Sequence, residues 1–132
     1  MGRIRLASSG GSMDIKSLAK GLAYVGEAQG KRQTYYIFEG RKHFFVMSFS
    51  RAKRNAGNFN IVNIEAVDYV RKRFAGAKGL TSQEVAKRNK RPRQFRTALE
   101  ALNILYILVA TGEAKVDQRH QASPQLFFNM SG

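Results

Sequence analysis

Lysine and arginine side chains are concentrated in one stretch of this chain, residues 71–96. Ten of them fall there against a single carboxylate, that of Glu84. Guanidinium and ammonium groups pair with phosphate oxygens, and like charges at this density repel one another unless a polyanion neutralises them. The segment therefore predicts a surface that binds nucleic acid.

A second basic stretch, residues 31–54, carries seven lysines and arginines against Glu39 alone. The rest of the chain has a net charge of −1, although the whole protein has +14 and a pI near 10.7. The basicity is thus local, which solubility alone does not require. In the second stretch we expect nucleic-acid contacts from five residues: Arg41, Lys42, Arg51, Lys53 and Arg54.

Aromatic residues lie among the basic residues of this second stretch and suggest an alternative mode of nucleic-acid binding. They are Tyr35, Tyr36, Phe38, Phe44, Phe45 and Phe49. A basic sheet with exposed rings can stack the bases of RNA or of single-stranded DNA. Core packing accounts for the same rings, because one face of a sheet must be buried. Both interpretations remain open at this level.

Catalysis has one weak signal, the sequence Glu113-Ala114-Lys115, which matches part of a metal-dependent nuclease site. Such a site needs a carboxylate on a preceding strand, whereas Glu84 and Glu100 both fall in predicted helices. His43 and His120 are solitary, and cysteine is absent. We therefore expect a non-catalytic protein without metal or cofactor, in a reducing, cytoplasmic compartment.

The elements that would position the basic residues begin with strands. Residues 34–38 and 43–50 are dense in aromatic and β-branched side chains around a glycine-containing turn, which predicts a β-hairpin. Residues 58–63 alternate polar with apolar side chains. This period of two predicts a third strand, with Phe59 and Ile61 facing the core.

A helix is predicted next, over residues 64–74, with Asn63 as its N-cap. Its apolar stripe, which we expect to lie on the sheet, consists of Ile64, Val67, Val70 and Phe74. Three basic residues, 71–73, fall in its last turn, where the helix dipole favours cations. This helix would lead directly into the first basic stretch.

The sharpest local signals lie in the second half. Thr81 stands three residues before Glu84, the capping box that begins a helix. Residues 89–92 should end it, and Pro92 suits the first turn of the next helix. Residues 102–109 either extend that helix or form a buried strand, and we favour the helix.

A second hairpin is predicted near the C-terminus. Thr111 and Gly112 should stop the preceding helix, and residues 113–118 would pair with residues 125–129. The segment of residues 102–109 is more apolar than a lone helix-turn-helix needs. We therefore predict a homodimer, and a protein-interaction module is a further alternative.

This order of elements over residues 80–129 resembles the winged helix-turn-helix superfamily. The resemblance is carried by Leu80–Arg88, a turn, a second helix, Thr111–Val116 and Leu126–Phe128. In that superfamily the second helix enters the major groove and a β-hairpin, the wing, contacts the adjacent backbone. Gly112 comes later after the second helix than is typical, so this helix is overlong or split. The resemblance implies phosphate contacts from Arg88, Lys90 and Arg91, and base contacts from Arg93, Gln94, Arg96 and Thr97.

The expected fold class is α+β, in one compact unit. Residues 13–75 would form a small basic antiparallel sheet with a helix, and residues 76–132 a winged helix-turn-helix-like region. Residues 1–12 have the composition of an expression leader and are left out of this prediction. The longest apolar run, residues 101–110, is about half the roughly 20 residues of a membrane span, so no membrane partner is expected.

The expected function is binding of duplex DNA by a small transcription regulator or a mobile-element accessory protein. Affinity would come from the arginines and lysines of residues 88–96, because they neutralise phosphates. Sequence reading would come from Gln94 and Thr97, since side-chain amides pair with adenine in the major groove.

Overall fold

The structure is a computed structural model that describes residues 2–5, 22–52, 56–120 and 123–132, with backbone alone for residues 2–5, 56 and 120. Its strands are β1 (Gly2–Arg5), β2 (Ala23–Gln29), β3 (Gln33–Glu39), β4 (His43–Ser50), β5 (Ala56–Asn63), β6 (Ala114–Val116) and β7 (Phe128–Met130). Its α-helices are α2 (Ile64–Arg73), α3 (Ser82–Lys87) and α4 (Ala98–Ala110), and a 3₁₀ turn spans Gln118–His120. The α+β class is confirmed.

The larger sheet has the strand order β1-β5-β4-β3-β2, with every pair antiparallel. The predicted hairpin is β3 and β4, in which Phe38 lies opposite Phe45 and Gln33 opposite Ser50. Gly2–Arg5, which the sequence analysis assigned to a leader, pair with the outer edge of β5. An edge strand presents unpaired backbone groups that a short segment can satisfy. The other leader residues lie outside the described part of the chain.

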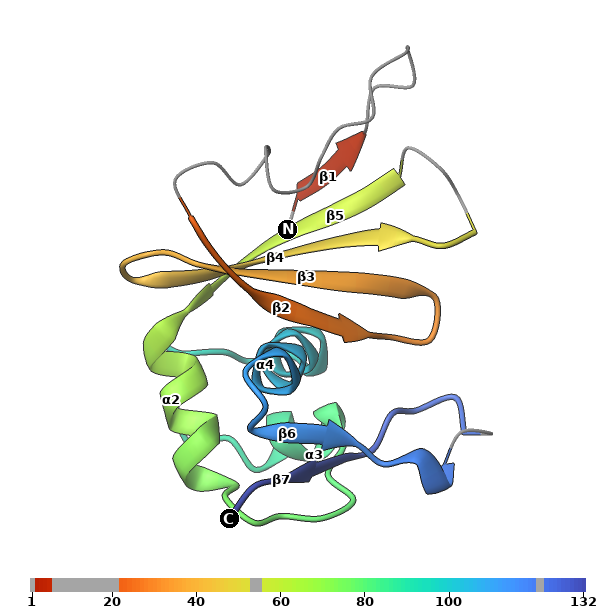
Figure 1. Ribbon diagram of the computed structural model, residues 1–132. Coiled ribbons are helices and arrows are strands. Elements are labelled where there is room, and N and C mark those ends of the chain that lie inside the picture. The colour runs from red at the N-terminus through yellow and green to blue at the C-terminus, as the bar shows by residue number, and fades with distance from the viewer. Residues whose placement is uncertain (1, 6–21, 53–55, 121–122) are drawn as a thin grey trace.

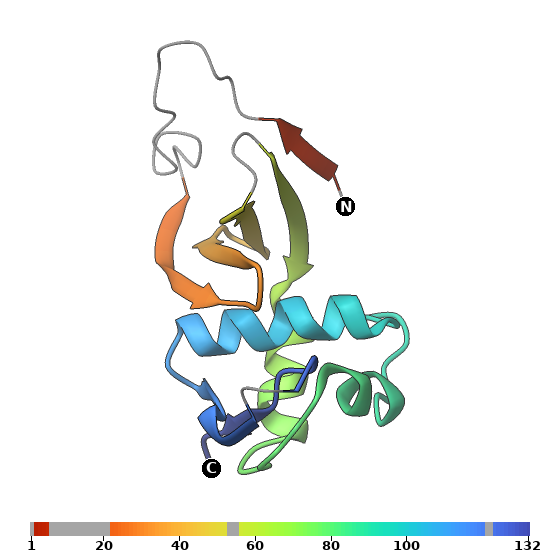
Figure 2. The same cartoon turned by 90° about the vertical axis from the view of Figure 1, so that its right-hand side faces the viewer.

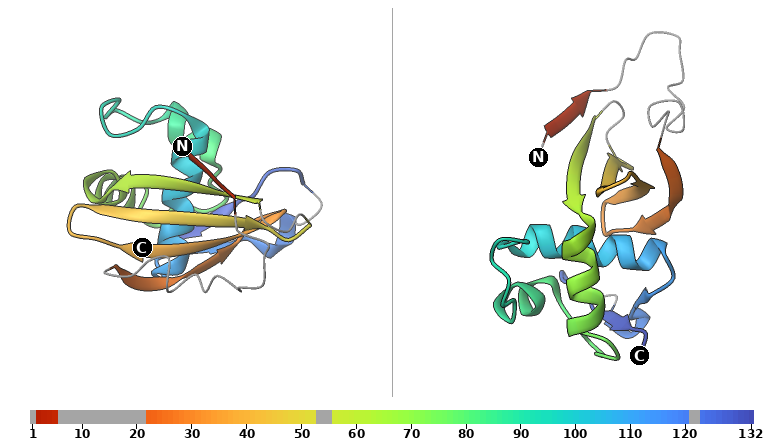
Figure 3. Two further views of the ribbon diagram at one scale, coloured as in Figure 1. Left: turned by 90° about the horizontal axis from the view of Figure 1, so that it is seen from above. Right: turned by 90° about the vertical axis from the view of Figure 1, so that its left-hand side faces the viewer.

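The sheet covers α4, and α4 in turn covers a lower layer of α3, β6 and β7 (Figures 1 and 2). Seen from above, α4 runs across the strands, while α2 descends beside them (Figure 3). Helix α4 is therefore enclosed from several sides. Seven of its thirteen residues are buried, which explains why residues 102–109 are apolar around the whole helix.

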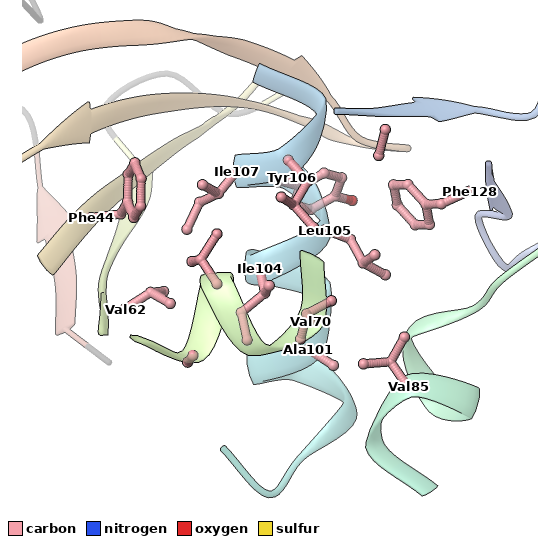
Figure 4. Close-up of a cluster of buried hydrophobic side chains, with 14 of the residues drawn as sticks. Phe44, Val62, Val70, Val85, Ala101, Ile104, Leu105, Tyr106, Ile107 and Phe128 are labelled. Atoms are coloured by element: carbon pink, nitrogen blue, oxygen red, sulfur yellow. The ribbon is translucent and has the colours of Figure 1, made fainter. Parts of the chain in front are cut away.

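Figure 4 shows how α4 supplies the centre of the core. Ile104, Leu105 and Ile107 are at most 1% exposed, and they lie among side chains from every neighbouring element. Phe44 and Val62 reach this cluster from the sheet, and Val70, Val85 and Phe128 reach it from α2, α3 and β7. The preferred prediction of a helix over residues 102–109 is confirmed, and the alternative of a strand is wrong.

The predicted inward face of β5 is wrong. Ile61 is 56% exposed, and Phe59 packs on the opposite face with Phe38 and Met47. Asn60 and Val62 are the residues of β5 that are buried beside the helices. An alternating pattern shows which side chains share a face, but not which face a helix covers.

Helix α2 begins where predicted, because the Asn63 side chain accepts a hydrogen bond from the Glu65 amide at 2.8 Å. Its buried residues are Ala66, Val67 and Val70. They pack on α4 and the end of β5 rather than across the sheet as expected. The basic last turn is thereby left at the far end of α2 from the sheet (Figure 1).

Helix α3 also begins as predicted, with the Thr81 hydroxyl accepting from the Glu84 amide at 3.1 Å. The next helix does not begin at Pro92. It begins at Ala98, because Thr97 and Glu100 form a reciprocal capping box. Residues 92–97 are therefore a turn segment before α4, and the predicted recognition helix lacks its basic first turn.

The predicted C-terminal hairpin is confirmed as β6 paired with β7, with Lys115 opposite Asn129. Gly112, at φ +84°, lies in the left-handed region directly after α4, where glycine is favoured. A bridge between Leu80 and Phe128 joins the hairpin to the start of α3. Among the described helices, none has the length and apolar character required to cross a membrane.

Candidate nucleic-acid interface

The C-terminal turn of α2 supplies the first cations of the candidate interface. Lys72 and Arg73 are exposed there, whereas Arg71 is partly buried and bound to two carboxylates, Asp68 and Glu113. Arg71 therefore ties α2 to the segment before β6. Of the three basic residues in this turn, two are left to contact a partner.

An aromatic ring joins α2 to the end of α3. Phe74, the C-cap of α2, is 2% exposed. The guanidinium carbon of Arg73 lies 5.6 Å from the centre of its ring, and that of Arg88 lies 5.1 Å from it. At this distance the ring quadrupole attracts the cation. Two arginines from different helices are thus held beside one another.

A second ring, Tyr69, positions the turn that follows α3. The guanidinium carbon of Arg91 lies 5.7 Å from its centre, and its hydroxyl accepts from the Lys90 amide at 2.9 Å. Asn89 fixes the same turn, because its side chain donates to the Phe95 carbonyl at 2.6 Å and accepts from the Arg91 amide at 2.8 Å. The turn is therefore anchored to α2.

We call these exposed cations, which α2, α3 and the following turn bring together, the basic cluster: Lys72, Arg73, Arg88, Lys90 and Arg91. A hollow of about 500 Å³ lies beside it, lined by three of these cations, by two carboxylates and by two further side chains: Lys72, Arg73, Arg91, Glu65, Asp68, Tyr69 and Gln94. Figure 3 shows α2 beside the segment that joins α3 to α4. The sequence predicted Arg88, Lys90 and Arg91 as contacts. It placed Phe74 in an apolar stripe and residue 89 in a helix stop, and it gave no role to Tyr69.

Carboxylates reduce this charge only in part. Residues 64–96 contain ten basic residues and three acidic ones, a net charge of +7. Asp68 is bound to Arg71, and Glu84 lies 3.9 Å from Arg88 in a pair that is about half exposed on both sides. Exposed pairs of this kind contribute little. The cluster therefore keeps a large positive excess.

The remaining predicted residues lie in the turn segment before α4. Arg93 and Arg96 are exposed, and Arg96 donates through Nε to the Pro92 carbonyl at 3.3 Å. Gln94 is half-buried and donates to Glu65 of α2 at 3.3 Å. None of the three is on a helix. The structure thus brings Gln94 next to α2, and the three side chains are not aligned along a recognition helix.

Thr97, predicted to contact a base, forms the N-cap of α4 and accepts from the Glu100 amide at 3.1 Å. We predict that Thr97→Ala lowers the free energy of unfolding by about 1 kcal/mol, because an amide loses its cap. Urea unfolding measures this loss, and Thr97→Ser should restore most of it. A weakened DNA affinity without any loss of stability would instead support the predicted base contact.

The second basic stretch is divided between the two ends of the sheet. Arg41 and Lys42 lie in the β3–β4 turn, and the Lys42 carbonyl accepts from the first amide of α2 at 3.1 Å. Arg51 lies at the other end, roughly 20 Å away along seven residues of β3. Its guanidinium donates to Gln29 at 3.0 Å and to the Gly30 carbonyl at 2.8 Å. These residues do not form one patch, and the predicted contacts Lys53 and Arg54 lie outside the described residues.

The aromatic residues of the sheet are also divided, between its two faces. Tyr35 and Phe44 face α4, where Tyr35 stacks on Tyr106 with ring centres 4.0 Å apart. The opposite face carries a cluster of rings that pack on one another: Tyr24, Tyr36, Phe38, Phe45, Phe49 and Phe59. Phe38 is 1% exposed, whereas Tyr24 is 44% exposed. Packing thus explains part of this aromatic content.

Glu113 and Lys115 do not share one contact network. Lys115 is exposed on β6, whereas Glu113 accepts from Arg71 at 3.0 Å and from Thr111 at 2.8 Å. Partial burial would raise the pKa of Glu113, but the hydrogen bonds from Arg71 and Thr111 outweigh it and lower the pKa. Within the described ranges, no three histidine or carboxylate side chains form a group that could hold a metal ion.

Comparison with known proteins adds no relative. No protein family, curated protein or solved structure matches this chain. The geometry of its own residues is therefore the basis for a functional proposal.

Proposed function

We propose that this protein binds nucleic acid through the basic cluster, with duplex DNA as its main partner and without catalysis. The observation that carries the proposal is the convergence of cations from α2, α3 and the following turn over Phe74 and Tyr69. Phosphate is the partner that fits, because a phosphate backbone offers closely spaced negative charges to such a surface. We propose a role as a small regulator or a mobile-element accessory protein.

A surface that serves only solubility explains the basic cluster less well than a phosphate-binding surface does. Ordinary protein surfaces mix charges of both signs, which lowers their electrostatic energy. Here three arginines are held beside aromatic rings, although side chains that serve only solubility need no fixed position. Positioned cations lose less conformational entropy when they bind an anion.

The winged helix-turn-helix resemblance is retained as a proposal in an altered form. The order of α3, turn, α4 and hairpin matches it, but α4 is enclosed in the core and cannot lie in a major groove along its length. We propose that residues 88–96, which join α3 to α4, contact the DNA instead. Gln94 would then read a base from this turn, and Gln94→Ala should lower sequence preference more than total affinity.

Homodimer formation also remains a proposal. The apolar residues that suggested it, Leu105 and Leu108 among them, are fully buried within the monomer. Exposed apolar surface for a dimer contact is left at Tyr24, which is 44% exposed. Sedimentation at micromolar concentration tests this, and a monomeric mass would refute the dimer.

The proposed function is tested by binding to duplex DNA, single-stranded DNA and RNA of one sequence at increasing salt. For duplex DNA we expect the strongest binding, with log affinity falling by about 0.9 per log unit of salt for each phosphate contact. Affinity that is independent of salt would contradict the proposal. A preference for single strands would instead favour the aromatic face of the sheet, the alternative drawn from the sequence.

A further inference from the structure

A groove of about 590 Å³ separates β5 from the start of α4. It is lined on one side by residues of β5, including Phe59 and Asn60, and on the other by residues of α4, including Asn103. The turn segment before α4 closes one end with Gln94 and Thr97. Seen from above, this segment projects beyond β5 (Figure 3). This volume is typical of pockets that bind small molecules.

The floor of the groove holds an unusual polar group. Asn60 is 8% exposed, and its Oδ1 has no hydrogen-bond partner among the described residues. Buried polar atoms are almost always hydrogen-bonded, so this acceptor would be satisfied by a ligand in the groove that donates to it. Asn103, 4% exposed, lines the same groove and donates to the Leu99 carbonyl at 3.2 Å.

The walls of the groove are apolar. Three large apolar side chains are exposed in the described part of the chain, and two of them, Ile61 and Leu99, line this groove. Ile61 is 56% exposed and Leu99 is 45% exposed. A ligand that presents apolar surface to these residues and an N–H group to Asn60 would therefore complement the groove.

The groove is continuous with the basic cluster. Gln94 lines both this groove and the hollow beside Tyr69, Arg73 and Arg91. The turn segment that closes the groove also carries Arg93 and Arg96, both exposed. A nucleic-acid strand with its phosphates on the cluster would therefore have the groove within reach of its bases.

We propose that the groove binds an unpaired nucleobase with an exocyclic amine, extruded from nucleic acid held on the basic cluster. The amine would donate to Asn60 Oδ1, and the base would lie against Leu99 and the edge of β5 at Ile61. An aliphatic side chain would leave Asn60 unpaired, and a carboxylate would be repelled by that oxygen and by Glu100. This inference rests on the proposed function, and it adds the class of group that the protein recognises.

The first test uses mononucleotides and nuclear magnetic resonance of the labelled protein. AMP and CMP should shift the signals of Asn60, Leu99 and Asn103, whereas ribose 5-phosphate, which lacks the base, should not. Equal shifts with ribose 5-phosphate would overturn the inference, because the ligand would then be an anion and not a base.

The second test asks whether the base comes from nucleic acid. A duplex with one extra, unpaired adenine should bind at least tenfold more tightly than the fully paired duplex, and an unpaired thymine should gain less. Asn60→Leu should abolish the gain and leave paired-duplex affinity unchanged. The same substitution at Asn58, on the same strand face but outside the groove, should keep the gain.

Stability separates a binding role of Asn60 from a structural one. Asn60→Leu removes an unpaired buried acceptor, so its melting temperature should equal or exceed that of the parent. A lower melting temperature with the adenine gain intact would overturn the inference.

The outcomes also separate the groove from the proposed function. If affinity for the paired duplex depends steeply on salt but an unpaired adenine adds no affinity, the groove proposal is wrong and the proposed function is still supported. If AMP and the duplex with the unpaired adenine bind, but the paired duplex shows no salt-dependent binding, the proposed role of the basic cluster is wrong instead. If AMP binds but the bulged duplex gains nothing, the groove serves a free nucleotide and the proposal is wrong.

Discussion

Replacing Arg73, Arg88 and Arg91 together by glutamine should weaken binding to duplex DNA by roughly 10² to 10³-fold at about 0.1 M salt. Each arginine is exposed and lies over Phe74 or Tyr69, so each is placed to contact one phosphate. Three lost contacts should lower the slope of log affinity against log salt by about 2.7. Fluorescence anisotropy with a labelled duplex at four or more salt concentrations measures both quantities.

The matched control removes the same charge elsewhere. Lys31 and Arg32 lie in the β2–β3 turn and Lys115 lies on β6, all exposed and all outside the basic cluster. Their joint replacement by glutamine should leave most of the salt slope in place. Equal losses in the two triple variants would mean that net charge, and not the basic cluster, determines the affinity.

Tyr106→Ala should have the largest effect on stability, a loss of about 3–5 kcal/mol in the free energy of unfolding. Tyr106 is 2% exposed and lies between two layers. Its ring stacks on Tyr35 of the sheet with centres 4.0 Å apart and meets Phe128 of β7 edge-on at 6.1 Å. Removing the ring therefore opens a cavity between the sheet and the C-terminal hairpin. Urea unfolding followed by circular dichroism measures the loss.

Two further variants sharpen this prediction. Tyr106→Phe keeps the ring and removes only the hydroxyl, so it should cost about 1 kcal/mol. Burial raises the pKa of Tyr106 well above its ordinary value, and the neighbouring Tyr35 raises it further. This fits an enclosed, neutral phenol. Tyr24→Ala, at a site 44% exposed, should cost less than Tyr106→Ala. A loss below about 1 kcal/mol for Tyr106→Ala would show that the layers do not depend on this contact.

Local signals in the sequence predicted most of the elements. Asn63 and Thr81 act within their own helix ends, and Gly112 adopts the left-handed conformation that ends α4. Each of these caps and turns depends on interactions within a few consecutive residues, so it can be predicted from the sequence alone. The start of α4 was missed because Pro92 was preferred. Thr97 and Glu100 carry the same capping spacing as Thr81 and Glu84, and this signal could have placed the start.

Faces and contacts between distant residues could not be predicted in the same way. The alternation in β5 groups Phe59 with Ile61, but the position of α4 decides that Asn60 and Val62 are buried. Periodicity is a property of one strand, whereas burial depends on what packs against it.

In the candidate site, too, local features could be predicted from the sequence and contacts between distant residues could not. Its charges are evident in the sequence, since Arg88, Lys90 and Arg91 are close together along the chain. The rings that arrange them come from α2, 14 or more residues earlier, and no periodic pattern links Phe74 to Arg88. The unpaired oxygen of Asn60 has no sequence signal at all, because it depends on the absence of a neighbouring donor.

The most direct test of the basic cluster is the set of backbone amide signals that move when a short duplex DNA is added to the labelled protein at low salt. We predict that the largest shifts occur at residues 72–74, 87–91 and 93–94, with small shifts at residues 31–32 and 51. Shifts concentrated at the β2–β3 turn, or spread evenly over the surface, would contradict the proposal that one cluster of positioned cations binds the phosphate backbone.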